Sequence, residues 1–529
     1  MTKIITEDLR TSIANDFYES FAEDSVNNYY VFASSMEQSE NTIRNTQEDK
    51  RIFQKNVIFG RKVSSNDVRY MFNRNPWQEG VIYDSFDDTK DITTMNFYVT
   101  VVDGDTIDSP IKVYKCIRNG DGNPSTSRPS TSDVDLNNET LYEDGYVWKF
   151  MFEVPVADYS KYSTIDSLPY VENISVINNA VANISDIVIE KTKFELFKDL
   201  LLGNCNINAI VTEEERYKLE VVTENTPKAV VDAYVGMYIR TSDGTIHEII
   251  SSSVPTNNST ISNVLNLYVS LSDTDIADYS TPKQIEVVPK IEVSESPGER
   301  CIAYGILDEN GTLDDIEFDH KGTDYILAKA KIVLPEIISE FESENELRVI
   351  VSSENGHGSN PIKELYMSKL SVVSIFGEDG QTNIPNSNFY SKIGIVKNPK
   401  FRDSSFPLNI DNRLILTTSG DVTSFITLDN YIKQGDLMAK VHEIAYNFDE
   451  NATTIKCVDY DCGTGNQFVP GNIDILDKSD LSNVGTISID NFDYGNYLTY
   501  TGKLMHFVDF SRIERNSDKR EKIKLTFDF

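Results

Sequence analysis

The stretch from Asp144 to Pro155, Asp-Gly-Tyr-Val-Trp-Lys-Phe-Met-Phe-Glu-Val-Pro, constrains the fold more than any other part of the sequence. Its Asp-Gly pair predicts a turn, and Pro155 predicts an end because proline cannot donate a backbone hydrogen bond. Alternate positions carry four aromatic residues, namely Tyr146, Trp148, Phe150 and Phe152. Alternate residues of a strand share one face, so the pattern predicts one dry face and one half-polar face. We expect the middle strand of an antiparallel sheet, with these rings in the core.

The last eight residues, Lys522-Ile-Lys-Leu-Thr-Phe-Asp-Phe, alternate just as regularly. Polar residues separate Ile523, Leu525, Phe527 and Phe529. This pattern predicts a terminal strand that pairs in a sheet and does not fray. We expect this strand to share one sheet with the aromatic strand, which adds Phe527 and Phe529 to the predicted core.

Length and composition indicate several β-rich domains. The chain has 529 residues, and single cores stop growing at about 250 to 300 residues. Hydrophobic residues make up 39% and aromatic residues 10%, which disordered chains do not reach. The expected fold class is mainly β, with multiple antiparallel sheets or sandwiches and a few short helices.

The net charge of −35, from 49 basic and 84 acidic side chains, argues against nucleic acid as a partner. This net negative charge can keep the protein soluble because its molecules repel one another, or it can serve to dock the protein onto basic neighbours in an assembly. The sequence has neither a membrane-length apolar run nor the apolar segment of a signal peptide, so we expect no membrane insertion and folding in a cytoplasm. Five scattered cysteines favour free thiols over a disulfide framework.

Local patterns predict two helices and a meander. Leu9, Ile13, Phe17 and Phe21 recur at helical spacing in residues 6–23, with Thr6 as the expected N-cap. A short helix is predicted over 65–72, and the polar residues 37–50 are interpreted as a loop. Strands are expected over 97–102 and 111–117, followed by a long surface loop over 119–140.

No catalytic, cofactor-binding or metal-binding residue emerges. The five histidines are too far apart in sequence to form a visible metal pair. His357 is interpreted as part of a glycine-rich turn, and Cys457 and Cys462 as structural thiols, with a zinc site including His442 as the alternative. The acidic stretches at 84–91 and 459–461 are interpreted as solvated loops, with Ca²⁺ binding as the alternative. Trp77 and Trp148 are assigned to the core, with sugar stacking as the alternative.

Four stretches together resemble the baseplate wedge subunit of contractile-tailed, T4-like phages, the product of gene eight in that group. They are 144–155; Val113-Tyr-Lys-Cys-Ile117; Phe59-Gly-Arg-Lys-Val with Val68-Arg-Tyr-Met-Phe and Asn75-Pro-Trp77; and Ile393-Gly-Ile-Val-Lys-Asn-Pro399 with Thr501-Gly-Lys-Leu-Met505 and Ile523–Phe529. Their order matches the family. The resemblance implies a mostly antiparallel β fold, a homodimer, contacts to other wedge subunits in the virion tail baseplate, and neither catalytic activity nor a cofactor.

The resemblance covers about two fifths of the chain, and the rest reads as inserted β modules. The expected division is a family core over 1–195, inserts over 196–290 and 291–390, a return to the core over 391–400, a third insert over 401–495 and core strands over 496–529. The function expected is that of a structural baseplate subunit. Two alternatives are a receptor- or carbohydrate-binding tail protein that uses the inserted modules, and a virion depolymerase or peptidoglycan hydrolase.

Overall fold

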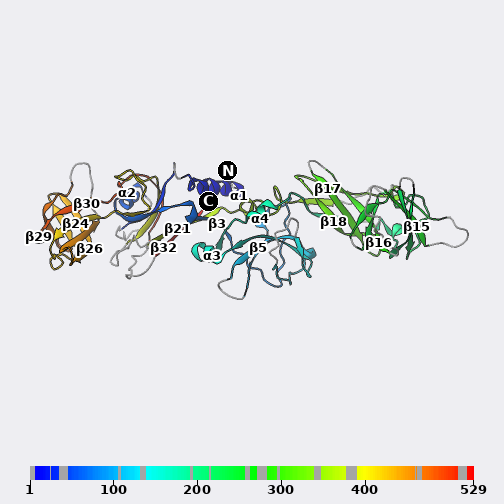
Figure 1. Ribbon diagram of the computed structural model, residues 1–529, viewed down its shortest axis with the longest axis horizontal. Helices are drawn as coiled ribbons and strands as arrows, with labels where there is room; N and C mark the ends of the chain where they lie inside the picture. Colours follow the sequence, from blue (N-terminus) through cyan, green and yellow to red (C-terminus); the bar gives the residue numbers. More distant parts are fainter. Residues whose placement is uncertain are drawn as a thin grey trace. The chain divides into compact units, whose positions relative to one another are not determined.

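The computed structural model describes the chain except for the following residues: 1–5, 24–25, 35–45, 105–108, 131–138, 191–194, 214–215, 243, 256–262, 271–282, 295–297, 339–346, 377–389, 459, 461–466 and 510–520. The protein is mainly β, with antiparallel sheets and short helices, which confirms the expected fold class (Figure 1). The chain forms two compact units. Unit 1 comprises Met1–Asn73, Ala157–Tyr170 and Tyr366–Phe529, and unit 2 comprises Arg74–Val156 and Val171–Leu365.

The described residues of unit 2 form three antiparallel sheets. A four-stranded sheet has the order β4-β5-β7-β6. Its strands are β4 (Tyr98–Val102), β5 (Ile111–Asn119), β6 (Glu139–Leu141) and β7 (Tyr146–Val154). A two-stranded ladder pairs β9 (Ile184–Ile189) with β20 (Leu347–Val351). Because β4, β5 and β7 are neighbours in the sheet, the predicted meander is confirmed.

The third sheet of unit 2 has ten strands, shown in green in Figure 1. Its members are β10 (Cys205–Thr212), β11 (Arg216–Thr223), β12 (Met237–Thr241), β13 (Ile246–Glu248), β14 (Ser251–Ser253), β15 (Val264–Ser270), β16 (Lys283–Ser294), β17 (Glu299–Leu307), β18 (Leu313–Thr323) and β19 (Lys329–Ile332). The long strand β16 pairs with β10 and β12 through its first part and with β17 and β19 through its last part. The expected boundary between inserts at residues 290 and 291 is therefore wrong, because it divides one continuous strand.

The aromatic strand β7 lies between β5 and β6, as expected for a middle strand. Tyr146, Trp148, Phe150 and Phe152 are at most 3% exposed. The opposite face is also covered, since Met151 is fully buried and Lys149 is 9% exposed. The half-polar face therefore contributes a buried lysine to the interior of unit 2.

In unit 1, the part of the chain that the structure describes also forms three antiparallel sheets, with the orders β23-β2-β1-β22-β31, β32-β21-β3-β8 and β29-β28-β25-β26-β27-β24-β30. The first consists of β1 (Tyr29–Ser34), β2 (Val57–Val63), β22 (Lys392–Lys397), β23 (Asn409–Asp411) and β31 (Lys503–Asp509). The second consists of β3 (Val68–Asn73), β8 (Ser167–Pro169), β21 (Lys369–Phe376) and β32 (Glu521–Asp528). The third consists of β24 (Leu414–Ser419), β25 (Tyr431–Gln434), β26 (Leu437–Asn447), β27 (Ala452–Val458), β28 (Gly471–Leu476), β29 (Asn483–Ile489) and β30 (Asn491–Asp493).

The terminal strand β32 is paired, but not in the sheet that the sequence predicted. It pairs along its whole length with β21 of unit 1, whereas β7 belongs to unit 2. Both edges of β7 are occupied by β5 and β6, which leaves no edge for β32. Phe527 and Phe529 are half-buried and contact Phe17, at ring-centroid distances of 5.4 and 5.5 Å. The single-sheet expectation is therefore wrong, and residues 1–195 are divided between the two units.

Short helices complete both units. They are α1 (Glu7–Ser20), α2 (Gln47–Lys55), α3 (Val156–Tyr162), α4 (Ile174–Asn178) and α5 (Pro361–Glu364), with single 3₁₀ turns at Ser65–Asp67, Ile92–Thr94, Gly120–Gly122, Lys198–Leu200 and Glu336–Ile338. Thr6 caps α1 through a hydrogen bond from the Leu9 amide, as expected. Leu9 and Ile13 remain 50% and 41% exposed, whereas Thr11 and Ala14 are buried. None of the described helices has the length and apolarity needed to cross a membrane.

Two local predictions are wrong. Residues 68–73 form the strand β3, because Val68 and its aromatic neighbours pair with β21 and β8. The polar residues 46–50 begin α2, where Thr46 and Asp49 form a capping box that compensates for a weakly apolar sequence. Residues 35–45 of the expected loop lie outside the described part of the chain.

Candidate functional site: a buried polar junction in unit 2

Unit 2 holds a cluster of charged and polar side chains that are largely removed from water, which we call the polar junction. Its members come from the loop after β3, from β5, β9 and β20, and from the segment that runs through α5. They are Asp87, Lys115, Arg118, Ser185, Asp186, Glu190, Arg348, Ser353, His357 and Glu364. The junction therefore joins stretches that are far apart in sequence.

The most buried part of the junction is an ion pair between β5 and α5. Lys115 Nζ lies 2.7 Å from Glu364 Oε2, and the two side chains are 0% and 4% exposed. Ser353 Oγ accepts a hydrogen bond from Lys115 and donates one to Glu364, and Glu364 Oε1 also accepts from the Gly358 amide. The Lys115 ammonium lies 3.6 Å from the centroid of the Phe86 ring. Burial lowers the pKa of Lys115, and the Glu364 carboxylate opposes that shift.

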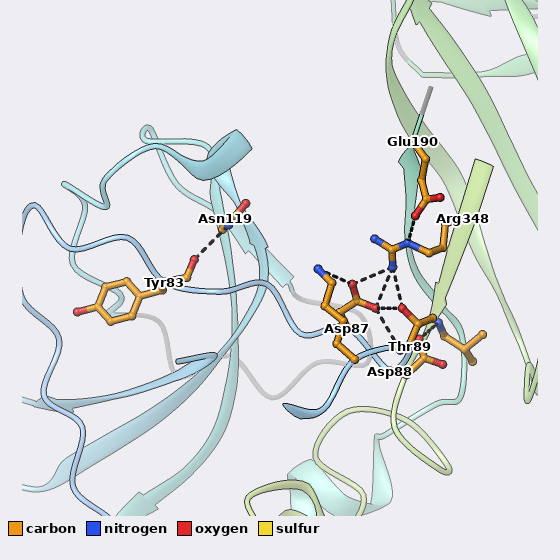
Figure 2. Close-up of polar contacts among 9 residues, drawn as sticks. Tyr83, Asp87, Asp88, Thr89, Asn119, Glu190 and Arg348 are labelled. Atoms are coloured by element: carbon orange, nitrogen blue, oxygen red, sulfur yellow. Dashed lines mark hydrogen bonds and ion pairs between the residues drawn. The ribbon is translucent and has the colours of Figure 1, made fainter. Parts of the chain in front are cut away.

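A second ion pair connects β20 to the loop after β3, as Figure 2 shows. Arg348 Nη1 donates to both carboxylate oxygens of Asp87, at 2.9 and 2.8 Å, and Arg348 Nε donates to Glu190 at 2.6 Å. Burial would raise the pKa of Asp87, but hydrogen bonds from Thr89 and Lys90 and the charge of Arg348 lower it below its ordinary value. Asp87 is only 2% exposed, so the solvated-loop interpretation is wrong for this residue. The cations that pair with Asp87 belong to the same chain, namely the Arg348 guanidinium and the Lys90 ammonium.

The strand β9 contributes a third set of contacts. Arg118 Nη2 lies 2.7 Å from Asp186 Oδ1, and Arg118 Nη1 lies 3.4 Å from Asp315 on β18. Lys321 Nζ donates to the Ser185 carbonyl oxygen at 2.7 Å. The four-stranded sheet, the β9–β20 ladder and the ten-stranded sheet of unit 2 are thus held together by charge-assisted hydrogen bonds.

Ser185 and His357 form the one contact in the junction with the residue types of a nucleophile and its base. Ser185 Oγ lies 2.6 Å from His357 Nε2. Burial lowers the pKa of His357 well below its ordinary value, and the positive charges of Lys115, Lys321 and Lys149 lower it further. The histidine is therefore neutral at pH 7. Since the two residues are 2% and 5% exposed, the contact works as a structural hydrogen bond.

The aromatic residues that sequence patterns selected lie outside the junction, whereas His357 and Asp87 of the acidic stretch 84–91 belong to it. Tyr146, Trp148 and Phe150 belong to one core cluster with Tyr83 and Val99, and Trp148 stacks on Tyr146 at 5.6 Å. Trp148 is fully buried and cannot stack on a sugar. Phe527 and Phe529 belong to unit 1, whereas the other four residues belong to unit 2.

Sequence reasoning missed Lys115, Glu364 and Arg348, and it assigned Asp87 to a solvated loop. One local signal existed, because Lys112 and Lys115 interrupt a strand whose other members are apolar from residue 111 to 117. A lysine in a strand that is buried on both faces needs an anionic partner. The sequence contains 84 acidic side chains, so it did not indicate which one.

The sequence also offered metal binding and free thiols as candidate chemistry. Among them, no group of three or more His, Cys, Asp or Glu side chains is arranged to hold a metal ion. Cys116, Cys205, Cys301 and Cys457 are free thiols, and Cys462 lies outside the described residues, as do Asp459 and Asp461.

Comparison with known proteins gives no matching family model and no matching curated protein. The function is therefore argued from the residues and their geometry.

Proposed function

We propose that the chain is a structural subunit of a phage tail baseplate wedge, which forms a homodimer and joins neighbouring wedge subunits in the virion. Four stretches whose residues and order resemble the gene-eight product family support this identity. In this role the protein is not an enzyme. It holds its neighbours in register during assembly in the host cytoplasm and lets them rearrange when the tail contracts.

The structural observation that supports a mechanical role is the interleaving of the two units. The chain passes from one unit to the other after residues 73, 156, 170 and 365. Neither unit is therefore a continuous stretch that could detach by unfolding from one end. Within unit 2, the polar junction fixes the start and the end of the inserted ten-stranded sheet, through Asp186 and Glu190 on one side and Arg348 on the other.

Size-exclusion chromatography with light scattering, on the full chain alone and mixed with candidate wedge proteins, tests the proposal. We expect a dimer that enters a larger complex. A stable monomer that associates with none of these proteins would contradict it.

A receptor- or carbohydrate-binding tail protein is the second candidate, favoured by exposed aromatic side chains within residues 401–495. Phe448 is 84% exposed and Phe425 is 62% exposed, and the Phe448 ring lies 4.7 Å from that of Tyr446. Exposed aromatic rings offer faces on which sugars can stack. Binding of the full chain to a glycan array, lost on Phe448→Ala, would favour this candidate over the first.

A further inference from the structure

Unit 1 contains a positively charged hollow, which is unexpected in a chain with a net charge of −35. The hollow has a volume of about 610 Å³ and lies between α2 and the turn that leads into β31. Its lining residues are Gln47, Lys50, Arg51, Gln54, Tyr500, Gly502, Lys503 and Leu504. Three of these are cationic and none is acidic.

The cations of the hollow have no anionic partner among the described residues. The Lys50 side chain is half-buried and those of Arg51 and Lys503 are exposed, whereas Lys115 and Arg348 of the polar junction each have a carboxylate within 3 Å. For Lys50, Arg51 and Lys503, the described part of the chain provides no ion pair. In addition, Lys397 on β22 stands directly opposite Lys503 in the ladder with β31.

The two walls of the hollow are held in place by specific contacts. Gln54, which is 8% exposed, donates from Nε2 to the carbonyl oxygens of Thr501 and Gly502, at 3.2 and 3.4 Å. Gly502 has a φ of +77°, and a Cβ there would lie 2.8 Å from Val396 and 2.9 Å from the Lys397 carbonyl oxygen. The capping box of Thr46 and Asp49 fixes the start of α2. The hollow is therefore formed before any ligand arrives, which reduces the entropic cost of binding.

A strand edge lies next to the cations. In the described part of the chain, β31 is the last strand of its sheet and pairs only with β22. Met505 and Val508 on this strand are 38% and 39% exposed. Lysine on an edge strand often serves to prevent unwanted pairing, and Lys503 alone would fit that role. Lys50 and Arg51 come from a helix, so edge protection does not account for the charge of the hollow.

We propose that this surface binds an extended acidic segment of a partner polypeptide, with carboxylates against Lys50, Arg51 and Lys503 and with its main chain added along β31. The edge of β31 that no described strand covers favours a polypeptide over a small anion, because only a peptide main chain can extend the ladder. The acidic remainder of the protein repels such a segment only at short range at physiological salt, where the Debye length is about 8 Å. This inference does not rest on the proposed baseplate function.

Fluorescence anisotropy on the full chain tests the charge requirement. The probe is a labelled peptide of three glutamates followed by alternating valine and threonine, compared with the same peptide carrying glutamines. The triple variant Lys50→Glu, Arg51→Glu, Lys503→Glu should bind the glutamate peptide at least about tenfold more weakly than the parent chain. The matched control is Lys363→Glu, Lys433→Glu, Lys478→Glu, which changes exposed lysines outside the hollow and alters the net charge equally. It should keep binding within about twofold. Equal loss in both variants, or equal binding of the glutamine peptide, would overturn the proposal.

Hydrogen exchange tests the strand edge in the unmodified protein, so its result does not depend on how the variants fold. The glutamate peptide should slow amide exchange in residues 503–509, whereas inorganic phosphate should not. If phosphate displaces the peptide and β31 gains no protection, the hollow is a small-anion site and the proposal fails. If the triple variant instead abolishes self-association seen by light scattering, the occupant is a second copy of this chain, which also overturns the proposal.

Discussion

Lys115 and Glu364, which are 249 positions apart in sequence, form a fully buried ion pair with 2.7 Å between Nζ and Oε2. Such a pair contributes little net stability relative to apolar residues of equal volume, but loss of one partner leaves a charge without compensation in a dry interior. The pair therefore fixes which segment lies against β5.

Lys115→Met should lower the free energy of unfolding of unit 2 by about 3–5 kcal/mol, since the Glu364 carboxylate would remain buried without its cation. Trp77 and Trp148 are the only two tryptophans of the chain, and both lie in unit 2. Urea unfolding followed by tryptophan fluorescence therefore reports directly on the loss of structure in this unit. Lys363→Met, at a side chain that is 66% exposed, is the control and should change little. The double variant Lys115→Met, Glu364→Gln should recover part of the loss, and no recovery would contradict the ion-pair explanation.

Arg348→Lys tests whether the second ion pair depends on the guanidinium geometry. Arg348 contacts Asp87 through Nη1 and Glu190 through Nε at the same time. A lysine keeps the charge but has a single nitrogen, so it cannot hold both carboxylates. We expect a loss of about 1–2 kcal/mol in the same fluorescence assay, reduced by the partial exposure of this side chain. An unchanged urea midpoint would show that charge alone is sufficient here.

Local structure was predictable where a short pattern determines it. The alternation of aromatic residues from Tyr146 to Phe152 predicted β7, and the cap at Thr6 predicted the start of α1. The alternation at the C-terminus predicted a paired strand, since one apolar face requires a sheet to cover it. These features depend on neighbours within a few residues.

Pairing partners were not predictable in the same way. The strand β32 pairs with β21, about 150 residues earlier, and nothing in either pattern excludes another antiparallel partner. The partner of Lys115 in the polar junction was even harder to predict, because any of the 84 acidic side chains could have formed an ion pair with it. The helix expected over 65–72 failed since tertiary pairing with β21 and β8 outweighed a weak helical period.

Acidification should destabilise unit 2 through His357. Its pKa is well below 6.5 in the folded protein, because the ring is buried beside lysines, but has an ordinary value near 6.5 when unfolded. Between these two values the unfolded chain binds a proton that the folded chain does not. The contribution of His357 to stability is thus complete above about pH 6.5 and is lost as the pH falls, by about 1 kcal/mol between pH 7 and pH 5.5.

His357→Gln should remove this part of the pH dependence when unfolding is followed by tryptophan fluorescence. His442→Gln is the matched control, because burial also lowers the pKa of His442, to about 3, but His442 lies in unit 1 and outside the region that the tryptophans report on. His442→Gln should leave the pH dependence of the free energy of unfolding, followed by tryptophan fluorescence between pH 7 and pH 5.5, unchanged. If His357→Gln retains the full slope, another group of unit 2 is responsible.

The turn that delivers His357 and Glu364 to the junction depends on Gly356. This residue has a φ of +99°, and a Cβ there would lie 2.4–2.5 Å from backbone atoms of Val181. Gly356→Ala should therefore cost both the left-handed backbone strain and a steric displacement, together about 2–4 kcal/mol. Gly80→Ala separates the two effects, because Gly80 has a φ of +83° but no atom within 4 Å of the added methyl group. It should cost only about 1 kcal/mol in the tryptophan-detected unfolding of unit 2. Equal losses in the two variants would mean that the contact with Val181 does not constrain this turn.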